Sequence, residues 1–380
     1  MQILIVNQAE VRRLLPMAEC LEVMEETLAA LARGEALLPL RQVLMLPGGQ
    51  GAFGAMPAHL SSPPALGIKV ITVFPGNHGT EYDSHQGAVL LFETERGRLL
   101  AVMDASSITA IRTAAVSGVA TRALARPEAA TLALLGSGVQ AATHLEAVAL
   151  VRPLRRVRVW SPTADKRQAF AATLRERFAF DVVDAPTLEA AVKDAPIVTL
   201  VTRAKDPFLH ASHLARGAHL NAVGAILPAN AEFHQDVFDR VSLIGWANGG
   251  VAALWTIRPR AAKKDDKPDF RSAIAFYPGC RRLRDTAWSA RMPTLILVGA
   301  KDDWASASAC QQMVAGARGR TARATIQVYP NAYHDFDHPN LPLQQRNNVL
   351  VNGAPARVHV GTDQVARADA MKRVAEWLAR

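Results

Sequence analysis

Two glycines and an alanine, placed between a buried strand and a helix, form the first group of residues that could bind a reactive molecule. In A-T-L-A-L-L-G-S-G-V-Q-A, Gly136, Gly138 and Ala141 follow the apolar run 130–135 and open a helix. In a G-x-G-x-x-A turn the first glycine permits the tight bend and the second lets the backbone approach a pyrophosphate. The alanine lets the helix pack on the strand. This context predicts a dinucleotide site, and a tight turn without a ligand is the alternative.

The end of the following strand indicates which nicotinamide cofactor would fit. An acid at that position would favour NAD, but Ser161 and Thr163 stand there instead. Lys166 and Arg167 follow closely and could meet a 2′-phosphate. The sequence therefore leans to NADP(H).

Two basic residues upstream form a second group. Lys69 lies inside the apolar, strand-like run G-I-K-V-I-T-V-F, which is costly unless the lysine faces a polar cavity. The alternative is an edge strand with Lys69 in water. Arg112 lies in a long predicted helix (106–125), where it either supplies a fixed guanidinium to a site or faces solvent.

A third candidate site is the stretch V-S-L-I-G-W-A-N-G-G, residues 241–250. It predicts a short strand followed by a Gly-rich turn with the shape of a nucleophile elbow, G-x-S-x-G. Ala247 occupies the position of the nucleophile. A methyl group cannot attack a carbonyl, so ordinary serine hydrolysis is excluded.

The hydrophobic periodicity around these sites predicts an α/β protein. An α+β segment ends near Arg126-Pro127, and alternating strands and helices follow it. The predicted strands are 2–6, 38–46, 67–74, 87–94, 99–104, 130–135, 156–160, 197–202, 219–224, 241–245, 272–277, 294–299 and 324–329, and the main predicted helices are 16–34, 106–125, 139–148 and 363–379.

Charge and composition narrow the classes of function. The net charge is +9, but residues 240–380 hold 21 Lys+Arg and 11 Asp+Glu while the preceding part is nearly neutral. The mixed run R-P-R-A-A-K-K-D-D-K (258–267) predicts a solvated surface loop rather than a nucleic-acid site. No apolar run approaches the roughly 20 residues of a membrane span, and the N-terminus lacks signal-peptide features. Three widely spaced cysteines suggest no disulfide framework and no metal site, so we expect a cytoplasmic protein.

Residues 1–240 resemble the ornithine cyclodeaminase/mu-crystallin family. The segments that carry the resemblance are G-I-K-V-I-T-V-F-P-G-N, H-Q-G-A-V-L-L-F, M-D-A-S-S-I-T-A-I-R-T-A-A-V-S, L-G-S-G-V-Q-A and H-L-N-A-V-G-A. The family implies a substrate and dimerisation domain followed by a Rossmann domain, hence a homodimer that binds NAD(P) and a small amino or imino acid. Lys69, Arg112 and Arg41 would bind the substrate carboxylate. The resemblance places the cofactor along Ser84, Val139, Gln140, Ser161, Thr202, Val223 and Gly224.

Two departures from that family pattern limit the activity. Cyclodeaminases carry an acid for proton transfer shortly after the fourth Rossmann strand, but residues 225–228 read A-I-L-P. This favours hydride transfer, as in reductases of cyclic imino acids such as Δ1-pyrroline-2-carboxylate or in amino-acid dehydrogenases. The family's C-terminal return to the first domain is also missing.

Residues 241–380 resemble the dienelactone hydrolase branch of the α/β-hydrolases. The segments are L-I-G-W-A-N-G-G, F-Y-P-G-C-R, L-I-L-V-G-A-K-D-D-W and Y-P-N-A-Y-H-D-F-D. The family's triad order places Ala247, Asp302 and His334 at the nucleophile, acid and base positions, with Asp303 as an alternative acid. The first four strands of that family are absent, together with part of the oxyanion hole. An inactive acid–base remnant is therefore one alternative function, and a non-catalytic chimera is another.

Joining the halves predicts three segments: 1–126 for substrate and dimerisation, 127–240 as the Rossmann half, and 241–380 as the hydrolase half. The strand 241–245 could be shared, giving one doubly wound, mostly parallel sheet of order 3-2-1-4-5-6-7-8. Separately folded fragments are the competing arrangement.

Overall fold

The computed structural model describes residues 2–32, 35–39, 41–77, 80–225, 230–259, 270–317, 324–351 and 354–379. The chain forms two compact units, Met1–Phe208 with Ser212–Glu232, and Leu209–Ala211 with Phe233–Arg380. Most of the predicted surface loop at 258–267, the predicted helix end at Gly34 and residues 226–228 of A-I-L-P lie outside the described residues.

The first unit begins with a seven-stranded sheet of order β1-β7-β6-β5-β4-β2, in which β3 also pairs with β4. All of its pairings are antiparallel except β1 with β7. Its strands are β1 (Leu4–Val6), β2 (Ala36–Leu37), β3 (Gln42–Met45), β4 (Ala52–Leu60), β5 (Ala65–Val73), β6 (His85–Phe92) and β7 (Leu99–Asp104). Two helices precede most of the sheet, α1 (Gln8–Leu14) and α2 (Met17–Ala32). The short 3-10 turns of the chain are η1 (Pro47–Gly49), η2 (Pro75–Asn77), η3 (Ala211–His213) and η4 (Gln235–Arg240).

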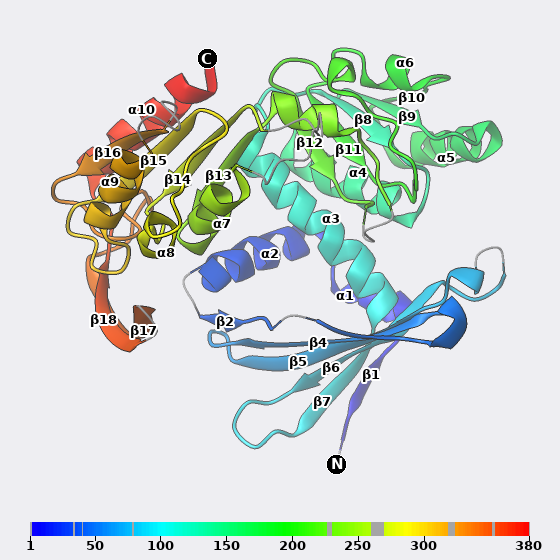
Figure 1. Ribbon diagram of the computed structural model, residues 1–380. Coiled ribbons are helices and arrows are strands. Elements are labelled where there is room, and N and C mark those ends of the chain that lie inside the picture. Colours follow the sequence, from blue (N-terminus) through cyan, green and yellow to red (C-terminus); the bar gives the residue numbers. More distant parts are fainter. Residues whose placement is uncertain are drawn as a thin grey trace. The chain divides into compact units, whose positions relative to one another are not determined.

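Helix α3 (Ala105–Leu124) runs from this sheet to the second sheet of the same unit (Figure 1). Asp104 caps it by accepting a hydrogen bond from the Ser107 N–H at 2.7 Å. The helix is rich in small buried residues, which lets α2 and α4 (Val139–Val151) pack closely on it. At Gly118 an added Cβ would lie 2.5 Å from Leu21 Cδ2. The predicted helix 106–125 is therefore confirmed, and it carries Arg112.

The second sheet of the first unit is parallel, with order β10-β9-β8-β11-β12. Its elements are β8 (Thr131–Leu135), α4 (Val139–Val151), β9 (Arg156–Trp160), α5 (Ala164–Arg177), β10 (Asp181–Asp184), α6 (Leu188–Val192), β11 (Ile197–Leu200) and β12 (His219–Ala222). Its centre is apolar and closed to solvent, because Leu132, Leu134, Val157 and Ile197 are all fully buried.

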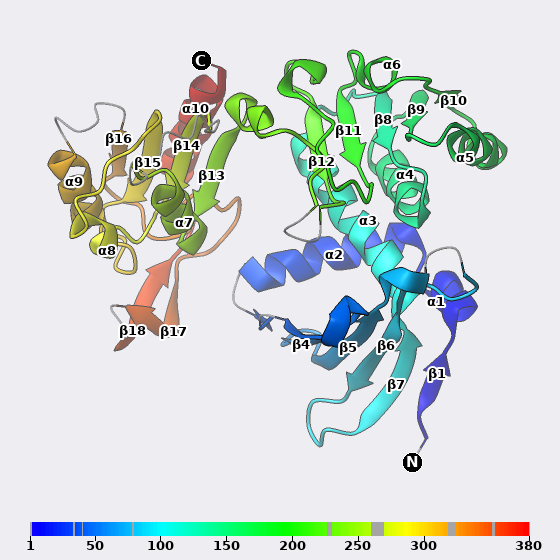
Figure 2. The same ribbon diagram turned by 45° about the vertical axis from the view of Figure 1, so that its right-hand side comes forward.

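The second unit contains a four-stranded parallel sheet of order β13-β14-β15-β16. Helices α7, α8 and α9 cover one face through Leu254, Leu283 and Met313, and α10 covers the other through Ala366 and Ala370 (Figure 2). The elements are β13 (Ser242–Trp246), α7 (Asn248–Thr256), β14 (Ser272–Phe276), α8 (Arg281–Arg284), β15 (Thr294–Gly299), α9 (Ala307–Gly316), β16 (Ala324–Tyr329), the antiparallel hairpin β17 (Gln344–Val351) and β18 (Ala354–Val360), and α10 (Gln364–Ala379).

The predicted continuous sheet of order 3-2-1-4-5-6-7-8 is wrong for the described part of the chain. Strand β10 completes the Rossmann order, so that β12 rather than 241–245 is the fifth strand of the parallel sheet of the first unit. Strand β13 instead begins a sheet of its own. The segment before β13 is already held within the second unit, since Phe233 bridges Leu209 and the His234 N–H donates to the Leu209 carbonyl at 2.8 Å.

The cysteine prediction is also wrong, because Cys280 and Cys310 form a disulfide with a Cα–Cα distance of 5.0 Å. They are 30 residues apart in sequence, but the helices α8 and α9 pack against each other and bring them together. Cys20 is free and buried. Across the described ranges, no cluster of metal-ligating side chains occurs. Nor does any described helix combine the length and the apolar character needed to cross a bilayer.

Candidate functional site

The turn between β8 and α4 has the backbone that a pyrophosphate requires. Gly136 has φ 134°, and a Cβ there would lie 2.7 Å from the Val201 carbonyl oxygen. Gly138 is the N-cap of α4, no side chain caps it, and no atom lies within 4 Å of where its Cβ would be. The helix N-terminus is therefore open to an anion. Val139, Gln140 and the fully buried Ala141 form the first turn of α4, as the sequence predicts.

Beside this turn lie the residues that the sequence predicts to contact a 2′-phosphate, and some of them already have partners within the protein. Ser161 is buried and its hydroxyl accepts a hydrogen bond from Ser137 at 3.2 Å, and Thr163 is the N-cap of α5. Arg167 is buried, ion-paired with Asp184, and bonded to the Ser161 carbonyl oxygen at 3.0 Å. The guanidinium of Arg167 thus already joins α5 to β10, and its contact with a 2′-phosphate stays a prediction. Lys166 is exposed.

At the ends of β11 and β12, a buried acid that sequence reasoning missed holds the two strand ends together. Glu232 is 1% exposed and accepts hydrogen bonds from the Thr202 N–H at 2.6 Å, the Thr202 hydroxyl at 2.7 Å and the Gly224 N–H at 2.7 Å. Thr202 follows β11, and Val223 and Gly224 follow β12. Gly224 must be glycine here, since a Cβ would lie 2.1 Å from the Thr202 carbonyl oxygen.

One signal for Glu232 was present in the sequence. It is the only Asp, Glu, Lys or Arg between Arg216 and Asp236. An isolated acid among apolar and small residues needs buried hydrogen-bond donors. An acid therefore does lie shortly after β12, contrary to the expectation from residues 225–228. Three hydrogen-bond donors occupy its carboxylate, so Glu232 has a structural role here.

Three basic residues of the first unit interact through their charges, and no carboxylate among the described residues pairs with them. Lys69 lies on β5, Arg112 on α3 and Arg41 directly before β3, and the Lys69 ammonium donates to the Thr109 hydroxyl at 3.4 Å. Burial, then Arg112 and Arg41, lowers the pKa of Lys69 to about 8. Burial and Arg41 also lower the pKa of Arg112. In the described part of the chain none of the three forms an ion pair, so their charges are available to an anion.

Ser84, expected along the cofactor, lies directly before β6. Its hydroxyl is 3.2 Å from the guanidinium Nη2 of Arg203, which donates to it. Arg203 follows Thr202, so this contact links the end of β11 to the antiparallel sheet of the same unit.

The second unit retains an elbow without a nucleophile. Ala247 has φ 47° and ψ −116°, between β13 and α7. The turn is so tight that a Cβ on Gly245 would lie 2.2 Å from the Gly249 carbonyl oxygen. Ala247 is therefore held in a strained backbone conformation that its methyl side chain does not use.

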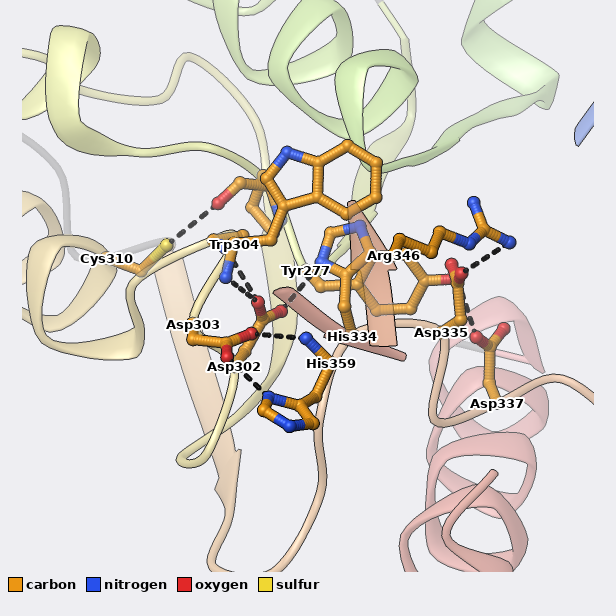
Figure 3. Close-up of polar contacts among 12 residues, drawn as sticks. Tyr277, Asp302, Asp303, Trp304, Cys310, His334, Asp335, Asp337, Arg346 and His359 are labelled. Carbon is orange, nitrogen blue, oxygen red and sulfur yellow. Dashed lines mark hydrogen bonds and ion pairs between the residues drawn. The ribbon is translucent and has the colours of Figure 1, made fainter. Parts of the chain in front are cut away.

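The acid and base of the predicted triad do meet. His334 Nδ1 lies 2.8 Å from Asp302 Oδ2, and both side chains are almost completely buried. Asp302 Oδ1 also accepts from the backbone N–H groups of Trp304 and Ala305. Figure 3 shows His334 beside the rings of Tyr277 and Trp304, each with its centroid 4.4 Å away. His334 Nε2 is buried without a hydrogen-bond partner in the described structure.

The alternative acid is excluded by its own partner. Asp303 accepts from the His359 backbone N–H at 2.9 Å and lies 2.8 Å from His359 Nδ1 (Figure 3). Asp302 is therefore the acid that orients His334.

Two family models match the chain. Residues 1–249 match the ornithine cyclodeaminase/mu-crystallin family, and residues 209–380 match the dienelactone hydrolase family. The two-part resemblance predicted from the sequence is therefore confirmed.

Several curated relatives and solved structures align with part of the chain. The chain is 38% identical over 210 residues to the ketimine reductase mu-crystallin of Mus musculus, covering 55% of this chain and 66% of that protein. It is 34% identical over 229 residues to a Δ1-pyrroline-2-carboxylate reductase of Bacillus cereus, covering 60% and 70%. It thus spans just under two thirds of the length of the mouse protein. The structure of a Thermococcus litoralis Δ1-pyrroline-2-carboxylate reductase with NADH and L-proline superposes with a TM-score of 0.61 and 28% identity, covering 65% and 76%.

Proposed function

Because this chain belongs to the ornithine cyclodeaminase/mu-crystallin family, we propose that it is an NAD(P)H-dependent reductase of a small cyclic imino acid, of which Δ1-pyrroline-2-carboxylate is the prototype. The observation that carries the proposal is the presence, in one compact unit, of an uncapped Gly136–Gly138 turn and an unbalanced group of three cations. The turn suits a pyrophosphate, and the cations suit a carboxylate.

The residues of the chain have separable tasks in this reaction. A bound reduced nicotinamide supplies the hydride. Arg112 and Arg41 hold the carboxylate of the substrate, because a guanidinium fork matches a carboxylate in two hydrogen bonds. Lys69 adds a third positive charge and, with a pKa of about 8, can carry a proton beside the imine near neutral pH. Gly224 lets the Thr202 carbonyl and the Glu232 carboxylate pack tightly against the end of β12, where the nicotinamide would lie.

The sequence indicates two basic residues, Lys166 and Arg167, that could favour NADPH over NADH. Arg167 is engaged with Asp184, so only Lys166 is free to meet a 2′-phosphate. We propose that NADPH binds no worse than NADH, with Lys166 as its sole added contact. A lower affinity for NADPH in the wild-type protein would contradict this assignment.

We propose the same roles for the three segments as the sequence predicts. Residues 1–126 bind substrate and form the dimer, residues 127–240 bind the cofactor, and residues 241–380 form a hydrolase-like unit. Homodimer formation is supported by apolar side chains left exposed on β1 and β3. The most exposed are Leu4, Ile5, Leu44 and Met45, each more than 60% exposed. Light scattering of the purified protein tests this assembly. The predicted cytoplasmic location stays a prediction, and the Cys280–Cys310 disulfide speaks against it.

Nucleotide binding and turnover test the proposal in two steps. Nicotinamide fluorescence during titration with NADPH and NADH measures binding, and loss of nicotinamide absorbance with Δ1-pyrroline-2-carboxylate measures reduction. Lys69→Met should abolish reduction and leave nucleotide binding unchanged, whereas the exposed Lys193→Met serves as the matched control. Failure of both nucleotides to bind at millimolar concentration overturns the proposal.

A second candidate function is supported by the Asp302–His334 pair and the elbow at Ala247. These residues form a hydrolase remnant that lacks its nucleophile. If the reductase tests fail and Ala247→Ser shows no ester hydrolysis, the chain is a chimera without catalytic activity in either unit.

A further inference from the structure

A buried histidine connects the first turn of α4 to the long helix α3. His144 lies on α4 and is fully buried. Its Nδ1 is 2.7 Å from the carbonyl oxygen of Gln140, in the turn of helix that follows Gly138. Its Nε2 is 3.1 Å from the hydroxyl of Ser117 on α3. The imidazole therefore spans the space between the dinucleotide turn and α3.

The chemistry of its partners fixes the direction of both hydrogen bonds of His144. A carbonyl oxygen can only accept, so Nδ1 carries the proton and donates it to the Gln140 carbonyl. Burial lowers the pKa of His144 to about 4, although the Gln140 carbonyl opposes the shift, so the ring is neutral near pH 7. Nε2 of the neutral ring is an acceptor, and the Ser117 hydroxyl donates to it. Neither ring nitrogen is left to exchange a proton with a substrate.

The buried hydrogen bonds continue from α3 to β12. The Thr121 hydroxyl donates to the Ser117 carbonyl oxygen at 2.7 Å and accepts from the Asn221 amide at 3.0 Å. The oxygen of that amide is 3.0 Å from His219 Nε2. Asn221 and His219 lie on β12, which ends shortly before Gly224. Helix α3 is thus tied by polar side chains both to α4 and to β12.

These polar contacts lie among small side chains. Ala114 and Ala115 of α3 share a buried cluster with Ala147 of α4, and an added Cβ on Gly118 would lie 3.2 Å from the Ala147 Cβ. Small side chains let two helices approach closely, but they interlock weakly and would pack similarly in more than one register. A buried polar pair satisfies its hydrogen bonds in one register only and therefore selects it.

The register of α3 affects the reaction because Arg112 lies on the same helix, five residues before Ser117. Arg112 holds the substrate carboxylate in the proposed function, whereas the turn at Gly138 holds the pyrophosphate. A shift of α3 along α4 would move the imine relative to the nicotinamide. Reacting atoms must approach to about 3–3.5 Å, and a misplacement of about 1 Å can cost roughly 100-fold in rate.

We propose that His144 is a positioning residue of the reductase: by joining Gln140 to Ser117, it sets the distance between the reduced nicotinamide and the imine carbon. This inference rests on the proposed reductase function and adds to it a residue that transfers no proton. In the reaction the imine carbon gains a hydride and the nicotinamide is oxidised. The imine nitrogen gains its proton from Lys69 or solvent.

Two substitutions break the link between the helices in different ways. Ser117→Ala removes the donor to Nε2. His144→Asn removes the ring but places an amide N–H near the position of Nδ1, so the bond to the Gln140 carbonyl can persist. We expect each variant to reduce Δ1-pyrroline-2-carboxylate with a kcat about ten- to 100-fold lower. The KM for the imine and the nucleotide Kd should stay close to the wild-type values, because the groups that bind both ligands are intact.

Two further measurements separate positioning from a purely structural role. The kinetic isotope effect with NADH deuterated at the transferring C4 position should rise in both variants, because hydride transfer becomes the slow step. The double variant should be no slower than the slower single variant, since both substitutions remove the same link. Thr173→Ala is the control, because its exposed hydroxyl bonds only to the Ala169 carbonyl of its own helix, and it should leave the kinetics unchanged.

A structural role alone predicts lower melting temperatures with unchanged turnover. An unchanged kcat and isotope effect in a folded Ser117→Ala variant therefore overturn the inference, and so do effects on kcat that multiply in the double variant. If Ser117→Ala does not fold, Ser117→Cys keeps a weaker donor of similar size. It should give a smaller loss of kcat in the same direction, and an unchanged kcat there also overturns the inference.

Failure of the reductase function gives a separate result. If the wild-type protein reduces no imine, that function fails, and calorimetry tests the link alone with pyrrole-2-carboxylate as the probe. Tighter binding of this probe with NADH than without it, a difference that disappears in Ser117→Ala, supports a geometry fixed between the two sites. The same difference in both proteins, or no binding of the probe, overturns the inference.

Discussion

The His334 imidazole and the Asp302 carboxylate, 2.8 Å apart and almost fully buried, form an intact acid–base pair in a unit whose elbow carries Ala247. The pair keeps its hydrogen bond, its ring neighbours and the backbone N–H groups that orient Asp302. The acid and the base are therefore in place in this unit, while the elbow position carries a methyl group instead of a nucleophile.

We expect Ala247→Ser to give weak hydrolysis of p-nitrophenyl acetate. The strained elbow would present a hydroxyl, and His334 can serve as its base. The rate should stay far below that of an intact hydrolase, since the resemblance implies that part of the oxyanion hole is absent. Losing one such donor alone costs roughly 100- to 1,000-fold. The measurement is ester hydrolysis in Ala247→Ser and in Ala247→Ser combined with His334→Ala. Equal rates in the two variants would show that the buried pair does not act as a base.

The pH dependence of turnover should report Lys69. Its pKa is lowered to about 8, so the ammonium that attracts the substrate carboxylate is present below pH 8 and is lost as the pH rises above it. We expect kcat/KM to fall about tenfold per pH unit on the alkaline side. In Lys69→Arg the side chain stays charged, so the fall should disappear or move to higher pH. An identical alkaline break in Lys69→Arg would assign it to another group.

Glu232 should contribute mainly to stability. Its carboxylate accepts three hydrogen bonds that join Thr202 to Gly224. A glutamine amide in its place has only one acceptor oxygen, and its NH2 group would face backbone and hydroxyl donors. We expect Glu232→Gln to lower the free energy of unfolding of the first unit by about 2–4 kcal/mol. Urea unfolding measures this change, with the exposed Glu95→Gln as the control. A loss of activity at unchanged stability would instead assign Glu232 a direct role in the reaction.

Local pattern predicted the dinucleotide turn well, because every feature of 130–148 agrees: an apolar strand, two glycines and a helix. Prediction from local pattern failed for strands whose residue preferences disagree with the structure that tertiary contacts impose. Strand β4 contains Gly54 and Pro57, which are depleted in strands, yet it pairs along its whole length with β5. Strand β10 has only four residues, D-V-V-D, and gives no clear periodicity. Its omission led directly to the wrong strand order.

Long-range pairings explain the remaining differences. The Cys280–Cys310 bond depends on the packing of α8 and α9, and the Arg167–Asp184 ion pair depends on β10. The link from Arg203 to Ser84 joins residues 119 positions apart. Residue type and spacing along the chain contain no direct record of such contacts, whereas they do identify Lys69, Arg112, Asp302 and His334 as candidates.

The two glycines of the dinucleotide turn should respond differently to substitution. Gly138 has a backbone that other residues adopt and open space at its Cβ position, and it is the N-cap of α4. Gly138→Asp should therefore preserve or raise stability by up to about 1 kcal/mol, because aspartate is a favourable N-cap. The same carboxylate should weaken nucleotide binding by at least about tenfold, since it occupies the position of the pyrophosphate and repels it.

Gly136→Ala should instead lower stability, because its φ of 134° and the Val201 carbonyl oxygen exclude a side chain. Thermal unfolding and nicotinamide fluorescence, measured on both variants, separate the two effects. Unchanged nucleotide binding by a folded Gly138→Asp variant would place the cofactor elsewhere.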